Sequence, residues 1–339
     1  MRALGLEWAP LDVPLQRRLE SFGILQFIIS FLFLGVGCIV ISLYVLLFTK
    51  YYWIILLYAA WYVYDYKTPE KGGRRVSFFR KMICWKYYRD YFPIKLVKTS
   101  ELDPSKNYIV GYHPHGVMAI GAFLNFATDA TNFCELFPGM KPVLLVLRGQ
   151  FNFPFFREYF MTTGSCSCSG KSMEWHLTKE GCGNVLILVP GGARESLECN
   201  PDNFNLILKN RRGFIRMAIK HGANLVPSFS FGENRTFVQV KSEKGSFLHA
   251  FQHRLTKILG FGVPIFHGRG IFNYTFGLLP YRTSITTILG EPIEVKMNQN
   301  PTQEEVDELH SFYVKKLIDL FETHKSEQGI LPDVHLNIV

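Results

Sequence analysis

The feature that constrains this chain most is a long apolar run near its start. Residues 22–48 include no Asp, Glu, Lys or Arg, and the run exceeds the roughly 20 residues that an α-helix needs to cross a bilayer. It is too long for the apolar part of a signal peptide, and no small-residue cleavage site follows it. A second apolar run, residues 51–64, is short for a complete crossing. The two runs predict a membrane hairpin or a span with a re-entrant segment; the alternative is a buried helix pair in a water-soluble fold.

Basic residues flank this hairpin at positions 17 and 18 before it and at positions 67, 71, 74 and 75 after it. Because Lys and Arg gather on the cytosolic side of membrane segments, both termini are expected in the cytosol. The sequence therefore predicts a cytosolic segment (1–21), a membrane hairpin (22–64) and a cytosol-facing catalytic domain (65–339).

The net charge of the chain indicates which partners it could bind, and its cysteines indicate whether it could hold a structural metal. A formal charge of +9 over 339 residues suits an anionic partner, namely nucleic acid, an acidic membrane face or a phosphorylated cofactor. The seven cysteines are odd in number and include no C-x-x-C pair, which argues against a structural zinc site and indicates reduced thiols.

After residue 65, short apolar runs alternate with helical patterns. Strands are expected at residues 107–112, 142–147, 184–190, 224–231 and 284–290, and helices at residues 116–130, 171–180, 211–221 and 246–259. A last helix should follow the capping box of Thr302 and Glu305. This alternation predicts an α/β fold with a largely parallel sheet.

The motif "HPHG" (113–116) lies where the first of these strands should end and a helix should begin. His115 would then stand at a strand-to-helix junction, where ligand sites of α/β sheets gather. The backbone amides of Gly116 and Val117, in the first turn of the expected helix, could face a developing oxyanion. Two alternatives stand beside this catalytic hypothesis. One is a metal site, for which the segment lacks further ligands, and the other is a buried, structural histidine pair.

Two further strands are expected to end in turns that carry a carboxylate. Gly191 and Gly192 follow one of them, and Glu195, three residues later, could orient His115 and stabilise its charge. Their backbone amides could also contribute to an oxyanion site. Glu233 follows the other strand and is a second carboxylate candidate. The alternative is a solvated loop with a tight turn.

Basic residues near the expected sheet edge could meet phosphates. Arg211 and Arg212 belong to a basic segment, and Arg269 lies in a glycine-flanked loop. They could bind a nucleotide cofactor or anionic headgroups, although a solvated helix face is the more frequent explanation. The chain has no G-x-S-x-G elbow, no Walker loop and no G-x-G-x-x-G after a strand.

Taken in order, these motifs resemble the diacylglycerol acyltransferase type 2 family of membrane acyltransferases. The matching stretches are "DYFP" (90–93), "HPHG" (113–116), "PGGARESL" (190–197), "RRGF" (211–214), "VPSFSFGEN" (226–234) and "GRGIF" (268–272). Within the family, "EWAPLDVPLQRRL", "LVKTSELDPSKNYI" and "ETHKSEQGI" are most similar to the monoacylglycerol acyltransferase branch.

The resemblance implies transfer of a fatty acyl group from acyl-CoA, a co-substrate rather than a cofactor, to a lipid hydroxyl at the endoplasmic reticulum. It implies that His115 is the base and that the partners are acyl-CoA, monoacylglycerol and the bilayer rather than nucleic acid. No metal is expected, because the HPHG segment supplies too few ligands. A neutral-lipid-binding pattern fits Phe31, Leu32 and Leu34. A homo-oligomer stays open, as do other acceptors (diacylglycerol, a long-chain alcohol or retinol) and a catalytically silent scaffold.

One departure from a related pattern concerns the base. The related glycerophosphate acyltransferases use H-x-x-x-x-D, whereas here Ile120 stands five residues after His115 and Met118 five residues after His113. The carboxylate that supports His115 must therefore come from elsewhere, and Glu195 is favoured over Glu233. His113 is expected to shape the loop rather than to transfer protons.

Overall fold

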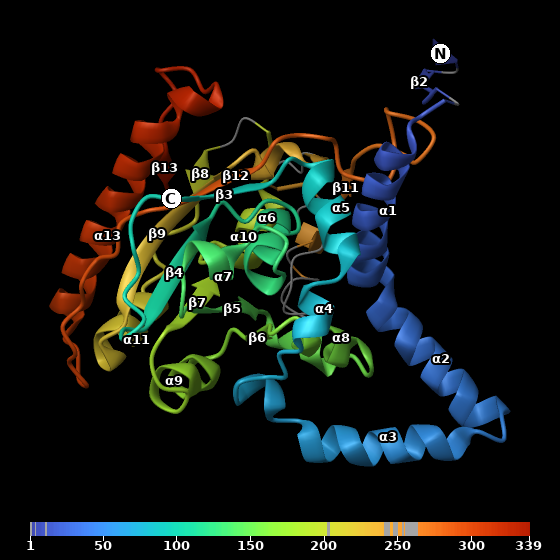
Figure 1. Ribbon diagram of the computed structural model, residues 1–339, viewed down its shortest axis with the longest axis horizontal. Helices are drawn as coiled ribbons and strands as arrows, with labels where there is room; N and C mark the ends of the chain where they lie inside the picture. The colour runs from blue at the N-terminus through green and yellow to red at the C-terminus, as the bar shows by residue number, and fades with distance from the viewer. Residues whose placement is uncertain are drawn as a thin grey trace.

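A seven-stranded sheet forms the centre of the computed structural model, which describes residues 2–3, 5–10, 12–201, 204–240, 245–246, 250–252, 254 and 264–339 (Figure 1). The strand order is β3-β12-β9-β4-β7-β5-β6. All neighbouring pairs are parallel except β12 with β9. The strands are β3 (Lys95–Lys98), β4 (Tyr108–His113), β5 (Lys141–Val146), β6 (Cys166–Ser167), β7 (Asn184–Leu188), β9 (Asn224–Phe231) and β12 (Thr286–Leu289). The predicted α/β fold with a largely parallel sheet is confirmed.

The two faces of the sheet build two separate cores. Along β4, Tyr108, Val110 and Tyr112 point into one core and Ile109 into the other, because successive side chains of a strand alternate. Helices α9 (Gly170–Thr178), α11 (Gly213–His221) and α13 (Gln303–His324) cover the face of Ile109. The opposite face is covered by α1 (Leu15–Ile29), α5 (Ile83–Tyr91), α6 (Ile120–Ala122), α7 (Phe133–Leu136) and α8 (Phe156–Thr162).

Four of the five expected helices are found, and one of these four begins later than expected. The fifth falls largely on residues that the structure does not describe. The expected capping box of α13 forms, because Thr302 accepts from the Glu305 N–H and Glu305 accepts from the Thr302 N–H. The helix expected at 116–130 begins only at Ile120 and continues as a π-helix over Phe123–Ala127. The helix expected at 246–259 lies largely outside the described residues.

Short elements complete the chain. They are strand pairs β1 (Arg2–Ala3) with β2 (Leu6–Glu7), β10 (Val238–Gln239) with β11 (Phe266–His267) and β13 (Asn337–Ile338) with β8 (Asn205–Leu206), helices α4 (Ser77–Arg80) and α10 (Gly192–Leu197), and the 3-10 turns Thr68–Glu70, Arg148–Asn152, Glu233–Arg235 and Ser326–Gln328.

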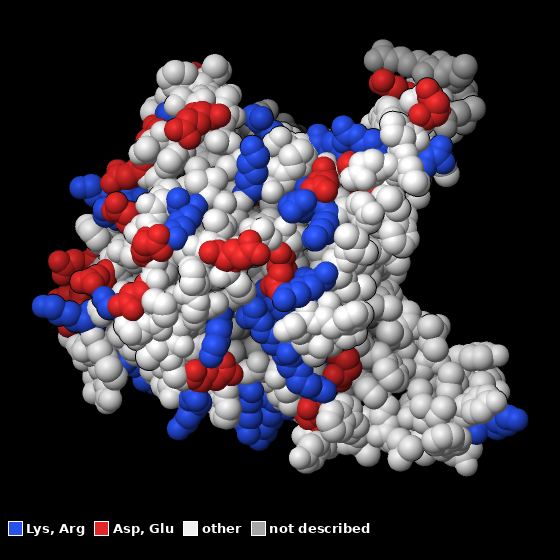
Figure 2. Space-filling model, in the orientation of Figure 1, with Lys and Arg blue, Asp and Glu red and all other residues white. Residues whose placement is uncertain are grey.

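One helix among the described residues is long and apolar enough to cross a membrane, Leu15–Phe48. It consists of α1, a π-helical turn (Ser30–Leu34) and α2 (Gly35–Phe48). The next helix, α3 (Tyr52–Asp65), has 14 residues and so spans about 21 Å, less than the roughly 30 Å of a bilayer core. Figure 2 shows the part of the surface over α2 and α3 almost free of charged side chains. A complete hairpin therefore stays a prediction.

The first half of the long helix packs on the α/β domain. Ile24, Phe27 and Ile28 are buried, and a Cβ added to Gly23 would stand 2.8 Å from the Tyr88 backbone nitrogen in α5. The boundary expected at residue 22 therefore falls inside α1, in the part of the helix that contacts α5. The division of the chain into 1–21, 22–64 and 65–339 remains a prediction.

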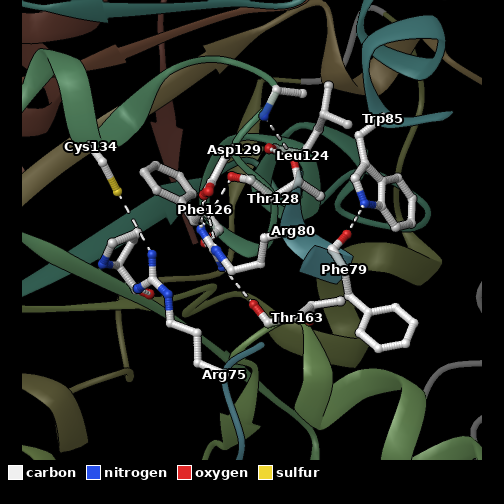
Figure 3. Close-up of polar contacts among 12 residues, drawn as sticks. Arg75, Phe79, Arg80, Trp85, Leu124, Phe126, Thr128, Asp129, Cys134 and Thr163 are labelled. Carbon is white, nitrogen blue, oxygen red and sulfur yellow. Dashed lines mark hydrogen bonds and ion pairs between the residues drawn. The ribbon is translucent and has the colours of Figure 1, made fainter. Parts of the chain in front are cut away.

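A buried arginine joins the segment after α3 to the domain (Figure 3). The Arg80 side chain is 1% exposed, and its Nε donates to Asp129 at 3.0 Å. Its other nitrogens donate to the carbonyls of Phe126, Thr128 and Thr163. Because a buried charge needs both a counter-charge and filled donors, this arrangement fixes α4 firmly to the core.

Candidate active site

Three parallel strands in the middle of the sheet bring the predicted site residues together at the C-terminal ends of these strands. β4 ends at His113, β7 runs into the turn before α10, and β9 ends just before Gly232 and Glu233. Since β4 is flanked by β7 and β9, the HPHG motif lies between the two carboxylate-bearing turns.

His113 is a buried residue of the core on the α13 face. It shares the strand face of Ile109, and its Nε2 lies 3.1 Å from the Tyr313 hydroxyl of α13. Tyr313 also donates to the carbonyl of Gly111 at 3.3 Å. Burial lowers the pKa of His113 to about 3, so its imidazole is neutral at physiological pH. Its expected role in shaping the loop stays a prediction.

His115 faces the other core. Its Nδ1 lies 3.0 Å from the carbonyl oxygen of Gly116, and because a carbonyl only accepts, Nδ1 carries the proton and Nε2 the lone pair. Burial lowers the pKa of His115, and hydrogen bonds with the local backbone oppose this shift. Among the described residues nothing binds Nε2, and a neutral imidazole with an available Nε2 lone pair is what a general base requires.

Glu195 contacts the backbone of His115 and not its imidazole, which is not the contact expected of it. Its Oε1 accepts from the backbone N–H of His115 at 2.6 Å and its Oε2 from that of Ile207 at 2.9 Å. Burial raises the pKa of Glu195, while these two hydrogen bonds and the charge of Arg211 oppose the rise. The carboxylate thus holds the backbone of the histidine, and among the described residues no carboxylate contacts the His115 imidazole.

Glu233 also binds backbone rather than the base. It accepts from the N–H groups of Ile120 (2.7 Å) and Gly121 (2.9 Å) and from the Tyr112 hydroxyl (2.8 Å). Burial raises its pKa to about 7, opposed by those same three hydrogen bonds. Glu233 therefore caps the helix that follows the motif, a task for which an anion at a helix start is well suited.

The turn between His115 and this helix corrects the expected oxyanion site. Gly116 (φ 60°) and Ala119 (φ 50°) have left-handed backbones, so residues 116–119 form a turn and Glu233 occupies the true helix start. The amides of Gly116 and Val117 are therefore not first-turn amides. Of the four predicted oxyanion donors, Val117 and Gly192 line the same cavity as His115, whereas Gly116 and Gly191 are not among its lining residues.

This cavity of about 390 Å³ is mainly apolar and reaches the long N-terminal helix, and its volume is that of a small-molecule site. His115, Val117, Gly192 and Ser196 lie on its wall, together with Phe123, Phe153, Phe156 and Phe160 and with helix residues Phe27, Phe31, Leu32, Gly35 and Val36. Two of the three residues of the lipid-binding pattern, Phe31 and Leu32, therefore line it. The third, Leu34, is 36% exposed on the outside of the helix.

The three predicted phosphate-binding arginines do not come together. Arg211 donates to the carbonyl of Gly191 at 3.1 Å and so lies beside the site. Arg212 pairs with Asp307 of α13. Arg269 is 8% exposed, and its guanidinium donates to Tyr91 and Ser21. Only Arg211 is placed next to the turn that carries Glu195.

Sequence reasoning missed two tyrosines of the site, Tyr313, which contacts His113, and Tyr112, which donates to Glu233. Tyr313 and Tyr112 carry no motif, and only the apolar stripe of α13 and the alternation of β4 could have pointed to them. Among the described residues, no three His, Cys, Asp or Glu side chains form a group that could hold a metal ion. All seven cysteines have free thiols.

Known proteins place this architecture in a family. A model of the family described as diacylglycerol acyltransferase matches residues 44–339. The chain is 49% identical to 2-acylglycerol O-acyltransferase 1 of Bos taurus and 47% identical to that of Homo sapiens, each over 96% of this chain and 97% of the relative. It is 46% identical to diacylglycerol O-acyltransferase 2 of Danio rerio, over 93% of this chain and 87% of the relative.

A solved structure of a glycerolipid enzyme is a more distant likeness. The crystal structure of the 1-acyl-sn-glycerophosphate acyltransferase PlsC from Thermotoga maritima is 14% identical, with a TM-score of 0.41 over 91% of this chain and 97% of that one. So distant a likeness supports no conclusion about this chain. The family model and the relatives suffice, and the chain belongs to the diacylglycerol acyltransferase family.

Proposed function

We propose that this protein transfers a fatty acyl group from acyl-CoA to 2-monoacylglycerol and so makes diacylglycerol. One observation carries the proposal, namely that a neutral histidine with a free Nε2 lone pair lies on the wall of an apolar cavity that reaches the membrane helix. The names of the relatives, which are acyltransferases of monoacylglycerol and diacylglycerol, support the reaction class.

In the proposed reaction, Nε2 of His115 takes the proton of a glycerol hydroxyl. The oxygen attacks the carbonyl carbon of the acyl-CoA thioester, and the carbonyl electrons move onto oxygen. The C–S bond then breaks, the ester forms, and CoA leaves as a thiolate that takes the proton from the imidazolium. Because a thiolate is a good leaving group, no covalent acyl-enzyme is required.

Backbone groups of the cavity wall would stabilise the intermediate. Val117, in the turn after His115, and Gly192, at the start of α10, line the same cavity, and their amides would face the oxyanion. Donors held rigidly toward developing charge in a water-poor site contribute strongly to such reactions. Glu195 would support this geometry by fixing the backbone of His115. The carbonyl oxygen of Gly116 would accept the Nδ1 proton of His115, in the place that a carboxylate takes in an acid/base dyad.

Residues around the site would bind the charged and the apolar parts of the substrates. Arg211, beside Gly191, would meet the phosphates of CoA. The long helix would hold the cavity at the depth where acyl chains dissolve, in the endoplasmic reticulum membrane with both termini in the cytosol. Nucleic acid has no part in this account, and a homo-oligomer is compatible with it.

Acceptor competition tests the proposal. Microsomes from cells that lack neutral-lipid acyltransferases would receive labelled oleoyl-CoA with 2-monoacylglycerol, diacylglycerol or a long-chain alcohol in parallel. Label in diacylglycerol from 2-monoacylglycerol supports the proposal. Label only in triacylglycerol or wax ester keeps the chemistry and changes the acceptor, and no label despite good expression would indicate a catalytically silent scaffold.

A further inference from the structure

Gly35 of the long helix and Phe153 of the α/β domain meet in the wall of the cavity. We propose that this contact determines the length of acyl chain that the enzyme accepts from acyl-CoA. The inference rests on the proposed function, because it assigns the cavity to the acyl chain of the donor. It names two residues, one from each side of the cavity, as determinants of chain length.

Aromatic contacts show that the cavity follows the helix away from the base. Near the catalytic turn, Phe27 packs on Phe123 with ring centroids 4.6 Å apart, and Phe123 is joined to His115 through two backbone hydrogen bonds at Ala119. One helical turn further along, the ring centroids of Phe31 and Phe160 are 6.5 Å apart.

The next turn of the helix brings Gly35 to Phe153. From residue 27 to residue 35 the helix rises about 12 Å, so this contact lies at the far end of the cavity from His115. Val36, the next lining residue, is 58% exposed. Gly35 and Phe153 therefore make the last enclosed point before the surface that faces lipid.

The contact depends on the absence of a side chain at position 35. A Cβ built on Gly35 would stand 3.0 Å from Cγ and 3.1 Å from Cδ1 of Phe153, which is closer than carbon atoms normally pack. The Phe153 ring is also held edge-to-face on Phe156, with centroids 6.0 Å apart. A larger residue at 35 must therefore occupy the end of the cavity or displace the ring.

Charge decides which substrate chain lies in this cavity. Arg211 donates to Gly191, and the neighbouring Gly192 lines the cavity at its catalytic end. An acyl-CoA with its thioester at His115 would direct its pantetheine arm and phosphates outward on the side of this cation, and its acyl chain the opposite way, toward Gly35. Monoacylglycerol has no anionic group for Arg211, so we assign the cavity to the donor.

The test compares substitutions at both sides of the contact with a matched control. Gly35→Leu fills the end of the cavity, and Phe153→Ala enlarges it. Gly37→Leu makes the same chemical change in the same helix, at a position where an added Cβ meets no atom within 4 Å. Each variant would be assayed with octanoyl-, dodecanoyl-, palmitoyl-, stearoyl- and arachidoyl-CoA and one fixed acceptor.

Gly35→Leu should lower the rate with stearoyl-CoA relative to dodecanoyl-CoA by on the order of tenfold, because about two methylenes lose their burial. Phe153→Ala should raise the relative rate with arachidoyl-CoA, and this arm stands even if Gly35→Leu does not fold. Gly37→Leu should keep the wild-type profile.

Three results would overturn the inference. The first is an unchanged donor profile in Gly35→Leu and Phe153→Ala, with the wild type active. The second is an equal shift in Gly37→Leu. The third, from a parallel series with one fixed acyl-CoA and acceptors of different chain length, is a shift that appears only when the chain of the acceptor is varied. A wild-type enzyme that transfers no acyl group would refute the proposed function itself, so the two failures are distinguishable.

Discussion

The role of Glu195 can be tested by Glu195→Gln, which changes one oxygen into an amide nitrogen and preserves the shape. Both carboxylate oxygens accept a backbone N–H, one from His115 at 2.6 Å and one from Ile207 at 2.9 Å. A glutamine has a single acceptor oxygen, so its NH₂ group must face one of these N–H donors. One buried donor is then left without a partner.

The magnitude follows from that lost bond. An unsatisfied buried donor costs about 1–3 kcal/mol, which corresponds to roughly 5–150-fold in rate if the productive position of His115 bears the whole loss. We expect the loss mainly in kcat, because the loop that carries the base is displaced. We expect the pKa seen in the acid limb of kcat/KM to stay unchanged, because the carboxylate does not contact the imidazole.

The assay is the pH profile of acyl transfer by wild type, Glu195→Gln and Glu308→Gln, the last an exposed carboxylate on α13. Glu308→Gln should behave as wild type. If Glu195→Gln instead moved the acid limb to lower pH by about one unit, the carboxylate would be stabilising the imidazolium directly, and the positioning role would be refuted. Full activity would refute both roles.

Three further substitutions have definite outcomes. Gly116→Ala adds a Cβ at φ 60°, 2.7 Å from Cγ of Glu233, and should destabilise the fold by at least the roughly 1–2 kcal/mol of a left-handed residue, seen as a lower thermal midpoint in detergent. Burial raises the pKa of Glu233 from 4.5 to about 7. The folded state therefore holds a proton that the unfolded state has lost, so wild-type stability should fall as pH rises between these values. Glu233→Gln should flatten that dependence in unfolding midpoints measured across the same range, and an equal slope would contradict the assignment. Arg80→Met leaves Asp129 without its buried partner and should cost about 3–5 kcal/mol of unfolding free energy, whereas the exposed Lys81→Met should leave the chemical-denaturation midpoint unchanged.

Most of the sheet was predictable from its residues. The five expected strands read as apolar runs because β4, β5, β7, β9 and β12 are largely buried on both faces. The edge strands β3 and β6 were not predicted, because one is short and partly exposed and the other has two residues. A periodic signal needs more residues than these strands contain.

The sequence predicted which residues form the site, but it did not predict which atoms of these residues contact one another. The motifs indicated His115, Glu195 and Glu233, but spacing cannot tell whether a carboxylate meets a ring or a backbone N–H. Two facts decide it here. Gly116 and Ala119 turn the chain before the helix begins, and Glu233 captures the first amides of that helix. The cavity was not predictable either, because it joins residues of the long helix to α8 across more than a hundred positions.

The most direct test of the central claim is the rate of acyl transfer to 2-monoacylglycerol by His115→Ala, measured beside wild type at equal amounts of folded protein. General base catalysis contributes about 10²–10⁴-fold, and the account predicts a loss of at least that size. His113→Ala should instead lose activity in proportion to its loss of folded protein, because His113 contacts Tyr313 and not the cavity. A folded His115→Ala enzyme with near wild-type turnover would contradict the account.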